Sequence, residues 1–589
     1  MRMTNKIMRS NSLYNINQNK ILEDKLTNQM TNQSKIARPS DDPVVAIRAL
    51  RLRSNVTTLT QYHDKNASDA DSWLTVTADA LNTIDEVLNG LYEQATSAAN
   101  KDLTADDLDI LMTQMKSLTN EFYASGNVDF AGRYVFSGFR TDTPITFTAA
   151  DKAEMERHPV SYEIHESKGY ADISTIDYTD FSVLSKTIGP DATDDIAGSA
   201  AGITADNASY EQSITNTTLY RIRLSYDAVD EGTTMSISDK NGNVIAPLDA
   251  ATLAGLPVAM DANGKLVDAA SGAEIQEDAN GNLVYANNSP VLGTRGELLD
   301  DTGAAVLDAN GNKVSLMAVQ QYTEYDNAEE AYRAVANGTE TGMVFIPKTG
   351  EIVFSKDYYD NMKEDDSFQI TYNKSEWQES DINPVHYFEC IETKDIGNGE
   401  TKKTAYNVTS ANQDIYYDVG YNQQIQVNTV ATEVFTHDVR RDMDDFKHCL
   451  DQLRSIETAI SDIEKKMAEY PVDSDEYKNW SKKLEGAKKA QSYIRENIHS
   501  KFENQITRYQ NYLDDNNIAI TNNATRGSRL DLITTRLMNQ KATFKDLQSD
   551  NEGIDVTQVA VELSSSELTY QAALMATGKI MQTNLMNYI

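Results

Sequence analysis

The 589-residue sequence is poor in cysteine, in basic charge and in long apolar runs. Its two cysteines, Cys390 and Cys449, are too few for a disulfide framework, and their separation fits no metal-binding pattern. No stretch has the length and hydrophobicity of a membrane-spanning helix. Residues 1–18 are polar and lack the apolar core of a secretory signal. We therefore expect no membrane insertion, and either a cytosolic protein or one exported without a cleaved signal peptide.

The shortage of basic residues gives the chain a formal net charge of −37. This charge repels nucleic acid and anionic lipid, so neither is expected as a non-specific partner. Because 40% of the residues are hydrophobic, the chain can build packed cores, and its length predicts several domains.

Recognisable catalytic patterns are also missing from the sequence. The pair His165-Glu166 begins like a zinc-protease helix, but Gly169 occupies the position of the second histidine. No glycine-rich phosphate loop, nucleophile elbow or Cys-x-x-Cys motif occurs. We therefore expect no catalytic residues, no metal site and no cofactor, and predict that the protein is not an enzyme.

The most informative stretch of the sequence is its last one, residues 552–589. Asp555 is a suitable helix cap, and apolar residues then recur at intervals of three, four and seven. These positions predict an apolar stripe along a long helix, which must be covered by another segment or another molecule. The stripe comprises Val556, Val559, Leu563, Tyr570, Leu574, Met581, Leu585 and Tyr588.

The first helix of the chain is a suitable partner for this last one. Residues 1–60 carry ten Lys/Arg against four Asp/Glu, a balance of +6, whereas residues 551–589 carry one lysine against four acids, a balance of −3. Opposite charges favour association of the two segments. Two interpretations remain open, an assembly surface or an ordinary helix pair inside one monomer. The expected face of the first helix comprises Met3, Ile7, Tyr14 and Ile21, with Leu22, Leu26 and Met30 beside it.

Between the two ends, the sequence predicts helices on either side of a β-rich region. Pro39 and Pro43 interrupt the first helix, and Asp42 is expected to cap the next, which runs to about residue 99. Thr104, with Asp107 three residues later, predicts the start of a third helix. After the β-rich region, helical periodicity returns at about residue 427 and breaks at Pro471. It then continues through residues 474–547, with a bend expected at 516–523 or at Gly527.

The β-rich region is predicted from alternating apolar residues in segments such as 220–226, 343–346 and 351–355. Four Asp-x-Asn-Gly units, beginning at residues 239, 261, 278 and 308, predict tight hairpin turns. Calcium binding is the weaker interpretation of these units, because the glycine comes too early for an EF-hand loop.

The resulting fold class is α+β, with paired N- and C-terminal long helices forming a coiled-coil or bundle rod and a large β-rich insert in the middle of the chain. We expect a terminal helical pair (1–37 with 551–589), a helical rod (38–140 with 431–550) and the insert (141–430), which has room for two subdomains. In the terminal pair, Val556, Leu563, Leu574, Met581 and Leu585 should line the contact. Pro39 and Pro43 should set the angle between the inner and outer helices.

Five segments together resemble the bacterial flagellin superfamily and, within it, the proteins of the hook–filament junction. They are Arg38-Pro-Ser-Asp-Asp-Pro43, Gly132-Arg-Tyr-Val-Phe-Ser-Gly-Phe-Arg140, Gly527-Ser-Arg-Leu-Asp531, Asp555-Val-Thr-Gln-Val559 and the ending Thr569–Tyr588. The resemblance covers about residues 1–145 and 430–589. The family motif it marks comprises Pro39, Ser40, Asp41, Asp42, Pro43, Gly132, Arg133, Tyr134, Phe136 and Gly138.

The resemblance implies a structural protein of the bacterial flagellum, an adapter needed for filament assembly and motility. The terminal helices would form an inner tube and the middle helices a rod outside it, with the insert projecting outward. The implied partners are further copies of the chain, the other junction protein on the hook side, flagellin on the filament side and an export chaperone at the C-terminal helix. The implied location is outside the cell, reached by type III export. The insert is longer than a minimal member needs, and the resemblance assigns it no function.

Three rival functions remain at this stage. A filament flagellin would differ from a junction adapter in copy number rather than chemistry. An enzyme would require a catalytic module in the insert, and a cytosolic signalling coiled coil would never leave the cell. For Arg133, Tyr134 and Phe136, strand packing on the rod is a simpler explanation than a specific role.

Overall fold

The computed structural model describes residues 5–100, 103–185, 210–230, 323–340, 342–360, 367–397, 400–407 and 413–582, with short segments between 237 and 316. The chain forms two compact units. Unit 1 contains residues 1–75, 415–427 and 523–589, and unit 2 contains residues 76–414 and 428–522.

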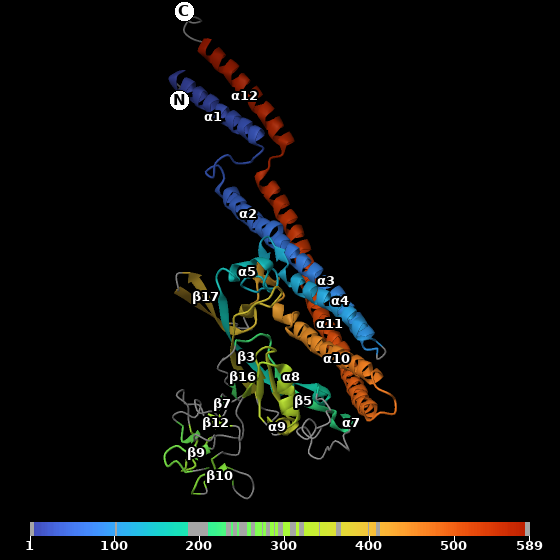
Figure 1. The fold of residues 1–589 in the computed structure, drawn as a ribbon. Coiled ribbons are helices and arrows are strands. Elements are labelled where there is room, and N and C mark those ends of the chain that lie inside the picture. The colour runs from blue at the N-terminus through green and yellow to red at the C-terminus, as the bar shows by residue number, and fades with distance from the viewer. Residues whose placement is uncertain are drawn as a thin grey trace, which may run out of the picture. The chain divides into compact units, whose positions relative to one another are not determined.

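Unit 1 brings the two ends of the chain together. The first helix, α1 (Asn5–Asn32), lies beside the last, α12 (Val556–Gln582), as Figure 1 shows. The α+β fold class predicted from the sequence is confirmed, with long terminal helices that pack together and a β-rich middle region. Unit 1 also contains α2 (Pro43–Gln61), the beginning of α3 (Ser68–Ala98) and the end of α11 (Asp475–Glu552).

The segment between α1 and α2 is held by the side chains that the sequence singled out. The Asp42 carboxylate accepts hydrogen bonds from the N–H groups of Val44 (2.9 Å) and Val45 (3.1 Å), and Pro43 is the first residue of α2. This arrangement satisfies amide groups that would otherwise lack partners, and the predicted cap is confirmed. Asp41 closes the preceding turn, because its Oδ2 accepts from the N–H groups of Ala37 (3.0 Å) and Arg38 (2.8 Å).

The helix predicted to run unbroken from Pro43 to about residue 99 is interrupted by a π-helical turn, η1 (Tyr62–Ala67). A β-hairpin formed by β19 (Tyr416–Gly420) and β20 (Gln423–Gln426) packs against this turn. Asn66 donates a hydrogen bond to the Asp418 carbonyl at 2.7 Å, and the Tyr417 hydroxyl donates to Asp69. An interruption of this kind depends on contacts with a segment distant in sequence, which the periodicity of the helix does not reveal.

Unit 2 contains a helical bundle and a β-sandwich. Its helices are the remainder of α3 and α11 together with α4 (Ala105–Ala124) and α10 (Asp438–Ala468). The predicted capping box of Thr104 and Asp107 is confirmed, with the Thr104 hydroxyl accepting from the Asp107 N–H at 3.2 Å. Helix α11 continues through both positions where a bend was expected. Its buried Asn516 donates to the Leu81 carbonyl of α3 at 3.1 Å, so the polar side chain serves the helix contact.

Two sheets form the sandwich. One has five strands in the order β13-β14-β15-β5-β4, and the other has four in the order β16-β3-β17-β18. The pairings are antiparallel except for β13 with β14, which is parallel. The strands are β3 (Val160–Gly169), β4 (Ile173–Asp180), β5 (Thr215–Arg223), β13 (Thr323–Glu324), β14 (Val344–Ile346), β15 (Glu351–Phe354), β16 (Ser367–Lys374), β17 (Glu389–Gly397) and β18 (Glu400–Tyr406).

The main core of the insert lies between the two sheets, because alternate residues of each strand point inward. Ile164 of β3, Ile222 of β5 and Tyr372 of β16 are fully buried there. The opposite face of the five-stranded sheet is covered by α8 (Ala328–Ala336), which buries Ala331, Tyr332 and Val335. The short helices α5 (Ala149–Met155), α7 (Tyr210–Ser213) and α9 (Lys356–Asp360) were not predicted.

Small hairpins occupy the described segments between residues 237 and 316. The strands flanking three of the predicted Asn-Gly turns pair antiparallel, as hairpins require, although the turns themselves lie outside the described residues. These pairs are β6 (Ile237–Ser238) with β7 (Val244–Ala246), β8 (Val258–Met260) with β9 (Leu266–Asp268), and β10 (Gln276–Glu277) with β11 (Leu283–Val284). Strand β12 (Val314–Leu316) pairs parallel with β7.

A buried ion-pair network fastens the sandwich to the helical bundle of unit 2. Arg221 of β5 lies 2.5 Å from Glu351 of β15 and 2.5 Å from Asp445 of α10, and the side chains of all three are at most 5% exposed. Arg223 of β5 pairs with Asp442 of α10 at 2.7 Å. Charged groups this deeply buried require such partners, so these contacts determine how the sheet meets α10.

The turn between β14 and β15 depends on Gly350, which has φ +61°. A Cβ atom at this position would collide with the Tyr226 carbonyl oxygen. We therefore expect Gly350→Ala to lower the free energy of unfolding of unit 2 by about 2 kcal/mol or more, since steric displacement adds to the cost of a left-handed backbone. Denaturant titration measures the loss.

Gly338→Ala is the matched control for this prediction. Gly338 also has positive φ (+70°), but nothing lies near its Cβ position, so it reports the backbone cost alone. Equal losses in the two variants would contradict the predicted collision at Gly350.

Candidate assembly surface

The junction between α11 and α12 is bonded to the segment that follows α1. The Lys35 N–H donates to the Glu552 carbonyl at 2.8 Å, and Ser34 pairs with Gly553 in an isolated β-bridge. Arg53 of α2 donates from Nε to Glu552 Oε1 at 2.9 Å, and its hydrogen bonds to Glu552 raise its pKa above the ordinary value. The chain therefore turns from α11 into α12 at a defined place.

Asp555 starts α12 in the way the sequence predicted. Its carboxylate accepts from the N–H groups of Thr557 (2.9 Å) and Gln558 (3.1 Å). These bonds satisfy amides at the first turn, where a negative charge also interacts favourably with the helix dipole.

Small and apolar side chains cover one side of the α1–α12 pair. The most buried are Leu26 of α1 and Val559 and Ser566 of α12, with exposures of 4%, 8% and 6%. Leu563 and Tyr570 are half-buried on the same side of α12, since they follow Val559 at helical spacing. Among the described residues, no ion pair joins α1 to α12, so the charge attraction expected between the two ends acts only at long range.

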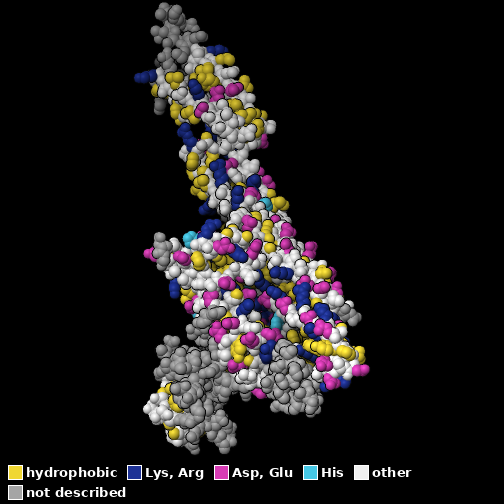
Figure 2. Space-filling view, in the orientation of Figure 1, with side chains coloured by type: hydrophobic (Ala, Val, Ile, Leu, Met, Phe, Trp, Pro, Cys, Tyr) yellow, Lys and Arg dark blue, Asp and Glu magenta, His cyan; other side chains and the backbone are white. Residues whose placement is uncertain are grey.

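The other side of the pair carries large apolar side chains that the described part of the chain leaves exposed. Figure 2 shows hydrophobic side chains gathered over these two helices. We call this set the outer face. In α1 it comprises Ile7, Leu13, Tyr14, Ile21 and Leu22, and in α12 it comprises Val561, Leu568 and Met575, with exposures between 46% and 69%.

The structure divides the predicted apolar stripes between the two sides. Ile7, Tyr14 and Ile21 lie on the outer face. Val556 (48% exposed) and Leu574 (45% exposed) lie at the border of the covered side, because helical spacing places them next to Val559 and Tyr570. Val559, Leu563 and Tyr570 are turned towards the covered side. Met581 is within α12, but its side chain lies outside the described residues, and so does Leu585.

The sequence analysis missed Leu13 of α1 and three outer-face residues of α12, Val561, Leu568 and Met575. The three in α12 recur every seven residues, but they lie off the single apolar stripe that the sequence predicts. The available signal was that apolar residues occur on more than one side of this helix, which indicates a helix with two contact faces.

The motif residues near position 40 belong to unit 1 and support the break between helices. Pro39 and Ser40 are exposed, while Asp41 and Asp42 bind backbone amides and Pro43 begins α2.

The motif residues at 132–138 belong to unit 2 and have structural contacts there. Gly132, with φ +76°, forms the turn of a short hairpin between β1 (Asp129–Phe130) and β2 (Arg133–Tyr134), and its N–H donates to Asp129 at 3.0 Å. The Arg133 guanidinium lies 5.6 Å from the centre of the Phe130 ring. Phe136 is buried edge-on against Phe435, and Gly138 packs closely against Gln413.

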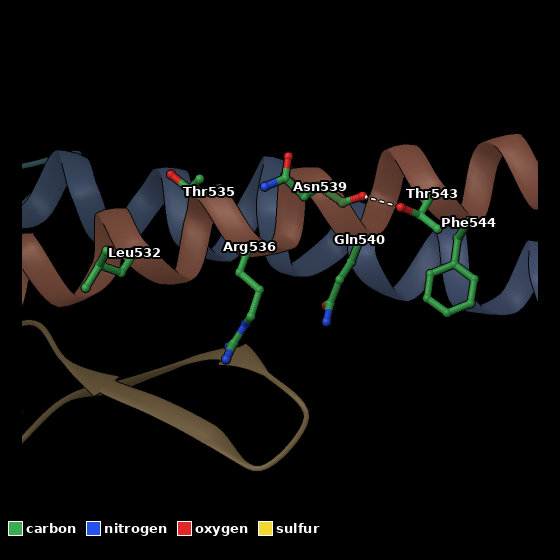
Figure 3. A pocket seen from close by; sticks show the side chains of 7 residues that line it. All are labelled: Leu532, Thr535, Arg536, Asn539, Gln540, Thr543 and Phe544. Atoms are coloured by element: carbon green, nitrogen blue, oxygen red, sulfur yellow. Dashed lines mark hydrogen bonds between the residues drawn. The ribbon is translucent and has the colours of Figure 1, made fainter.

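A shallow depression on α11 in unit 1 is lined by one helix face, shown in Figure 3. Arg536 extends from this face and donates a hydrogen bond to Gln423 of the β19–β20 hairpin. The other residues that line the depression are uncharged, and they are Leu532, Thr535, Asn539, Gln540, Thr543 and Phe544. The described part of the chain contains no group of three or more His, Cys, Asp or Glu side chains able to hold a metal ion. Among the same residues, no helix is both long and apolar enough to cross a membrane.

Comparison with known proteins finds similarity in the N-terminal region. Residues 3–141 match the model of the bacterial flagellin N-terminal helical region. The chain is 26% identical over 144 residues to flagellar hook-associated protein 3 of Escherichia coli K12, and 25% identical over 143 residues to the protein of the same name in Salmonella typhimurium LT2. Each match covers 24% of this chain and 45% of the relative, so the chain spans just under half the length of these curated relatives.

Two solved structures are similar to the chain at low sequence identity. FlgL of Xanthomonas campestris is 10% identical, with 84% of this chain and 98% of that chain covered and a TM-score of 0.24. The flagellar hook-associated protein 3 of Legionella pneumophila is 11% identical, with the same coverages and a TM-score of 0.19.

Proposed function

We propose that this chain, whose residues 3–141 are a flagellin N-terminal helical region, is a non-enzymatic structural protein of the bacterial flagellum that joins the hook to the filament. The observation that carries the proposal is the two-sided terminal pair. One side of α1 and α12 is covered within the pair, and the other presents eight large apolar side chains to the surroundings. An exposed apolar face of this kind is a contact surface for other protein molecules.

In this proposal the terminal pair, residues 1–37 with 551–589, forms an inner tube by packing its outer face against neighbouring copies and sister proteins. Burying one large aliphatic side chain contributes about 1.5–3 kcal/mol, so the outer face supplies a substantial driving force for assembly. The helices of 38–140 and 431–550 form the rod outside the tube, and the insert, 141–430, projects outward. Pro39 and Pro43 set the angle at which the inner helices leave the rod.

The partners follow from the position of an adapter. On one side it binds the other hook-associated junction protein, and on the other it binds flagellin. Before assembly, an export chaperone covers the C-terminal helix, because an exposed apolar face favours aggregation. The protein reaches the outside of the cell by type III export, and the related name hook-associated protein 3 supports this location.

Electron microscopy of cells that lack this protein tests the proposal. A junction adapter predicts hooks without filaments, and immunogold labelling of intact flagella predicts a single band at the hook end. Label along the whole filament would favour a filament flagellin. Absence of the protein from sheared flagella would favour a cytosolic role, and hydrolytic activity of the purified chain would favour an enzyme.

Polar substitutions on the outer face should separate assembly from folding. We expect the triple variant Val561→Ser, Leu568→Ser and Met575→Ser to unfold at nearly the wild-type temperature, because these side chains are 66–69% exposed. Filament attachment should nevertheless fall at least tenfold in a swimming or filament-counting assay, since three apolar contacts are lost.

The control for this triple variant is Ile396→Ser on β17, where an apolar side chain is 51% exposed on the insert. This variant should support normal filament attachment. Wild-type motility of the triple variant would contradict the assigned role of the outer face.

A further inference from the structure

Helix α2 presents a face of arginine and aliphatic side chains that no described residue covers. Its nineteen residues include three arginines and no acid, in a chain whose net charge is −37. Val44, Ile47, Arg48 and Arg51 are spaced by three and four and therefore share one face, with Leu50 at its edge. Val44, Ile47 and Leu50 are 67%, 56% and 65% exposed.

The two arginines of this face have no ionic partner among the residues that the structure describes. Arg53, the third arginine of α2, pairs with Glu552, whereas Arg48 and Arg51 form no ion pair with any described residue. The opposite side of α2 buries Ala46 and Ala49 and is bonded to α11, where Asn551 donates to the Val45 carbonyl at 3.2 Å. The basic face is therefore held rigidly and points away from its own support.

Helix α11 carries a face of the complementary kind. Ile518 is 60% exposed, and the exposed carboxylates Asp514 and Asp515 precede it by four and three residues, so all three lie on one side of the helix. Neither carboxylate pairs with another described residue. The adjacent residue Asn516 is buried and bonded to the Leu81 carbonyl of α3, which fixes the rotation of α11 at this point.

We propose that the α2 face of one copy of this chain docks on the Asp514–Ile518 face of α11 in a second copy. Each face has an aliphatic centre flanked by charges of one sign, and the signs are opposite. A second copy of the chain supplies to each face a partner of the opposite charge. Two different patches then meet, which makes the contact head-to-tail and allows it to repeat from copy to copy.

This contact is separate from the outer face of α1 and α12, and it does not depend on the proposed flagellar role. Charge complementarity would orient the copies, and the aliphatic centres would contribute most of the contact energy. Solvent-exposed charges are screened within about 10 Å at 0.1 M salt, so added salt should weaken the orientation.

Disulfide trapping of full-length protein tests the contact. In a background with Cys390→Ala and Cys449→Ala, Arg51→Cys and Asp515→Cys are introduced into separate chains, mixed in equal amounts and oxidised with copper phenanthroline. We expect the mixed 51–515 dimer to form at least tenfold faster than the 51–51 or 515–515 dimers. The 51–515 dimer should also form at least tenfold faster than the mixed dimer of Asp515→Cys with Lys402→Cys. Lys402 is an exposed position on β18. Raising the salt to 0.5 M should reduce the preference.

A second measurement avoids cysteine replacement. In sedimentation equilibrium of the otherwise native chain, Arg48→Glu with Arg51→Glu should lower the average mass, and Asp514→Arg with Asp515→Arg should do the same. Mixing the two variants should restore association, because the reversed faces match each other again. The matched control, Lys402→Glu with Lys403→Glu, should leave the mass unchanged. Absence of self-association in the wild-type chain, no preference for the mixed dimer, or no restoration on mixing would each overturn the proposal.

Discussion

Replacing Arg221 by alanine is expected to lower the free energy of unfolding of unit 2 by about 3–5 kcal/mol, because it leaves buried carboxylates without their main partner. The Arg221 guanidinium bridges Glu351 and Asp445, and the Tyr332 hydroxyl also donates to Glu351 at 2.5 Å. Asp445 retains Lys501 at 2.8 Å, whereas Glu351 loses its only ionic partner among the described residues. Urea unfolding followed by aromatic fluorescence measures the change.

Two further variants identify the physical origin of this loss. Arg157→Ala removes a surface ion pair with Glu154, whose side chains are 70% and 47% exposed, and should cost no more than about 1 kcal/mol. The double variant Arg221→Met with Glu351→Leu should be less destabilised than Arg221→Ala, since no carboxylate is then left unpaired at position 351. A loss in Arg221→Ala as small as in Arg157→Ala would show that the network contributes little to stability.

The same network makes an acid-dependent contribution to stability. Burial alone would raise the pKa of Asp445, but the charges of Arg221 and Lys501 hold it well below its ordinary value. Because the native pKa lies below the unfolded value, the contribution is complete above about pH 4 and is lost as the pH falls further. Arg221→Ala should therefore show its largest deficit at neutral pH and approach the wild type in acid.

Removing residues 553–589 is expected to abolish filament attachment while leaving unit 2 folded. The deletion takes away the α12 half of the outer face and uncovers Leu26 of α1. The sandwich and its ion-pair network lie entirely within residues 76–414 and 428–522, so they keep their contacts. Unfolding of the truncated chain should retain the wild-type transition of unit 2, measured by the fluorescence of Trp377 in the insert core.

Two assays distinguish this expectation from its alternatives. In the first, purified hooks are mixed with the truncated chain, and stacking of that chain on the hooks would show that assembly does not require α12. In the second, loss of the unit 2 unfolding transition would show that α12 supports the whole fold instead of a contact surface. The intact chain with Ile396→Ser provides the control for non-specific loss of binding.

Local features of this fold could be predicted from sequence because they depend on residues a few positions apart. Asp42, Thr104 and Asp555 cap helices at their predicted positions, since a side chain that binds an amide two or three residues ahead needs no distant partner. The strands expected at 220–226, 343–346 and 351–355 could likewise be predicted, because the alternation of apolar residues is a local pattern. The π-helical turn at Tyr62–Ala67 could not be predicted, because the contacts of Asn66 and Asp69 are with Asp418 and Tyr417.

The candidate assembly surface also has a part that the sequence predicts and a part that only the tertiary structure shows. The sequence by itself determined that both ends of the chain are amphipathic helices, because helical spacing makes that property local. Only the tertiary structure decided which side is covered, since α1 and α12 pack together although more than five hundred residues separate them. It also decided that Arg221 and Asp445 become buried partners, and that Arg48 and Asp514 form no ion pair with any described residue. The periodicity of a helix shows that an apolar face exists, and the packing of distant segments determines which faces are left for other molecules.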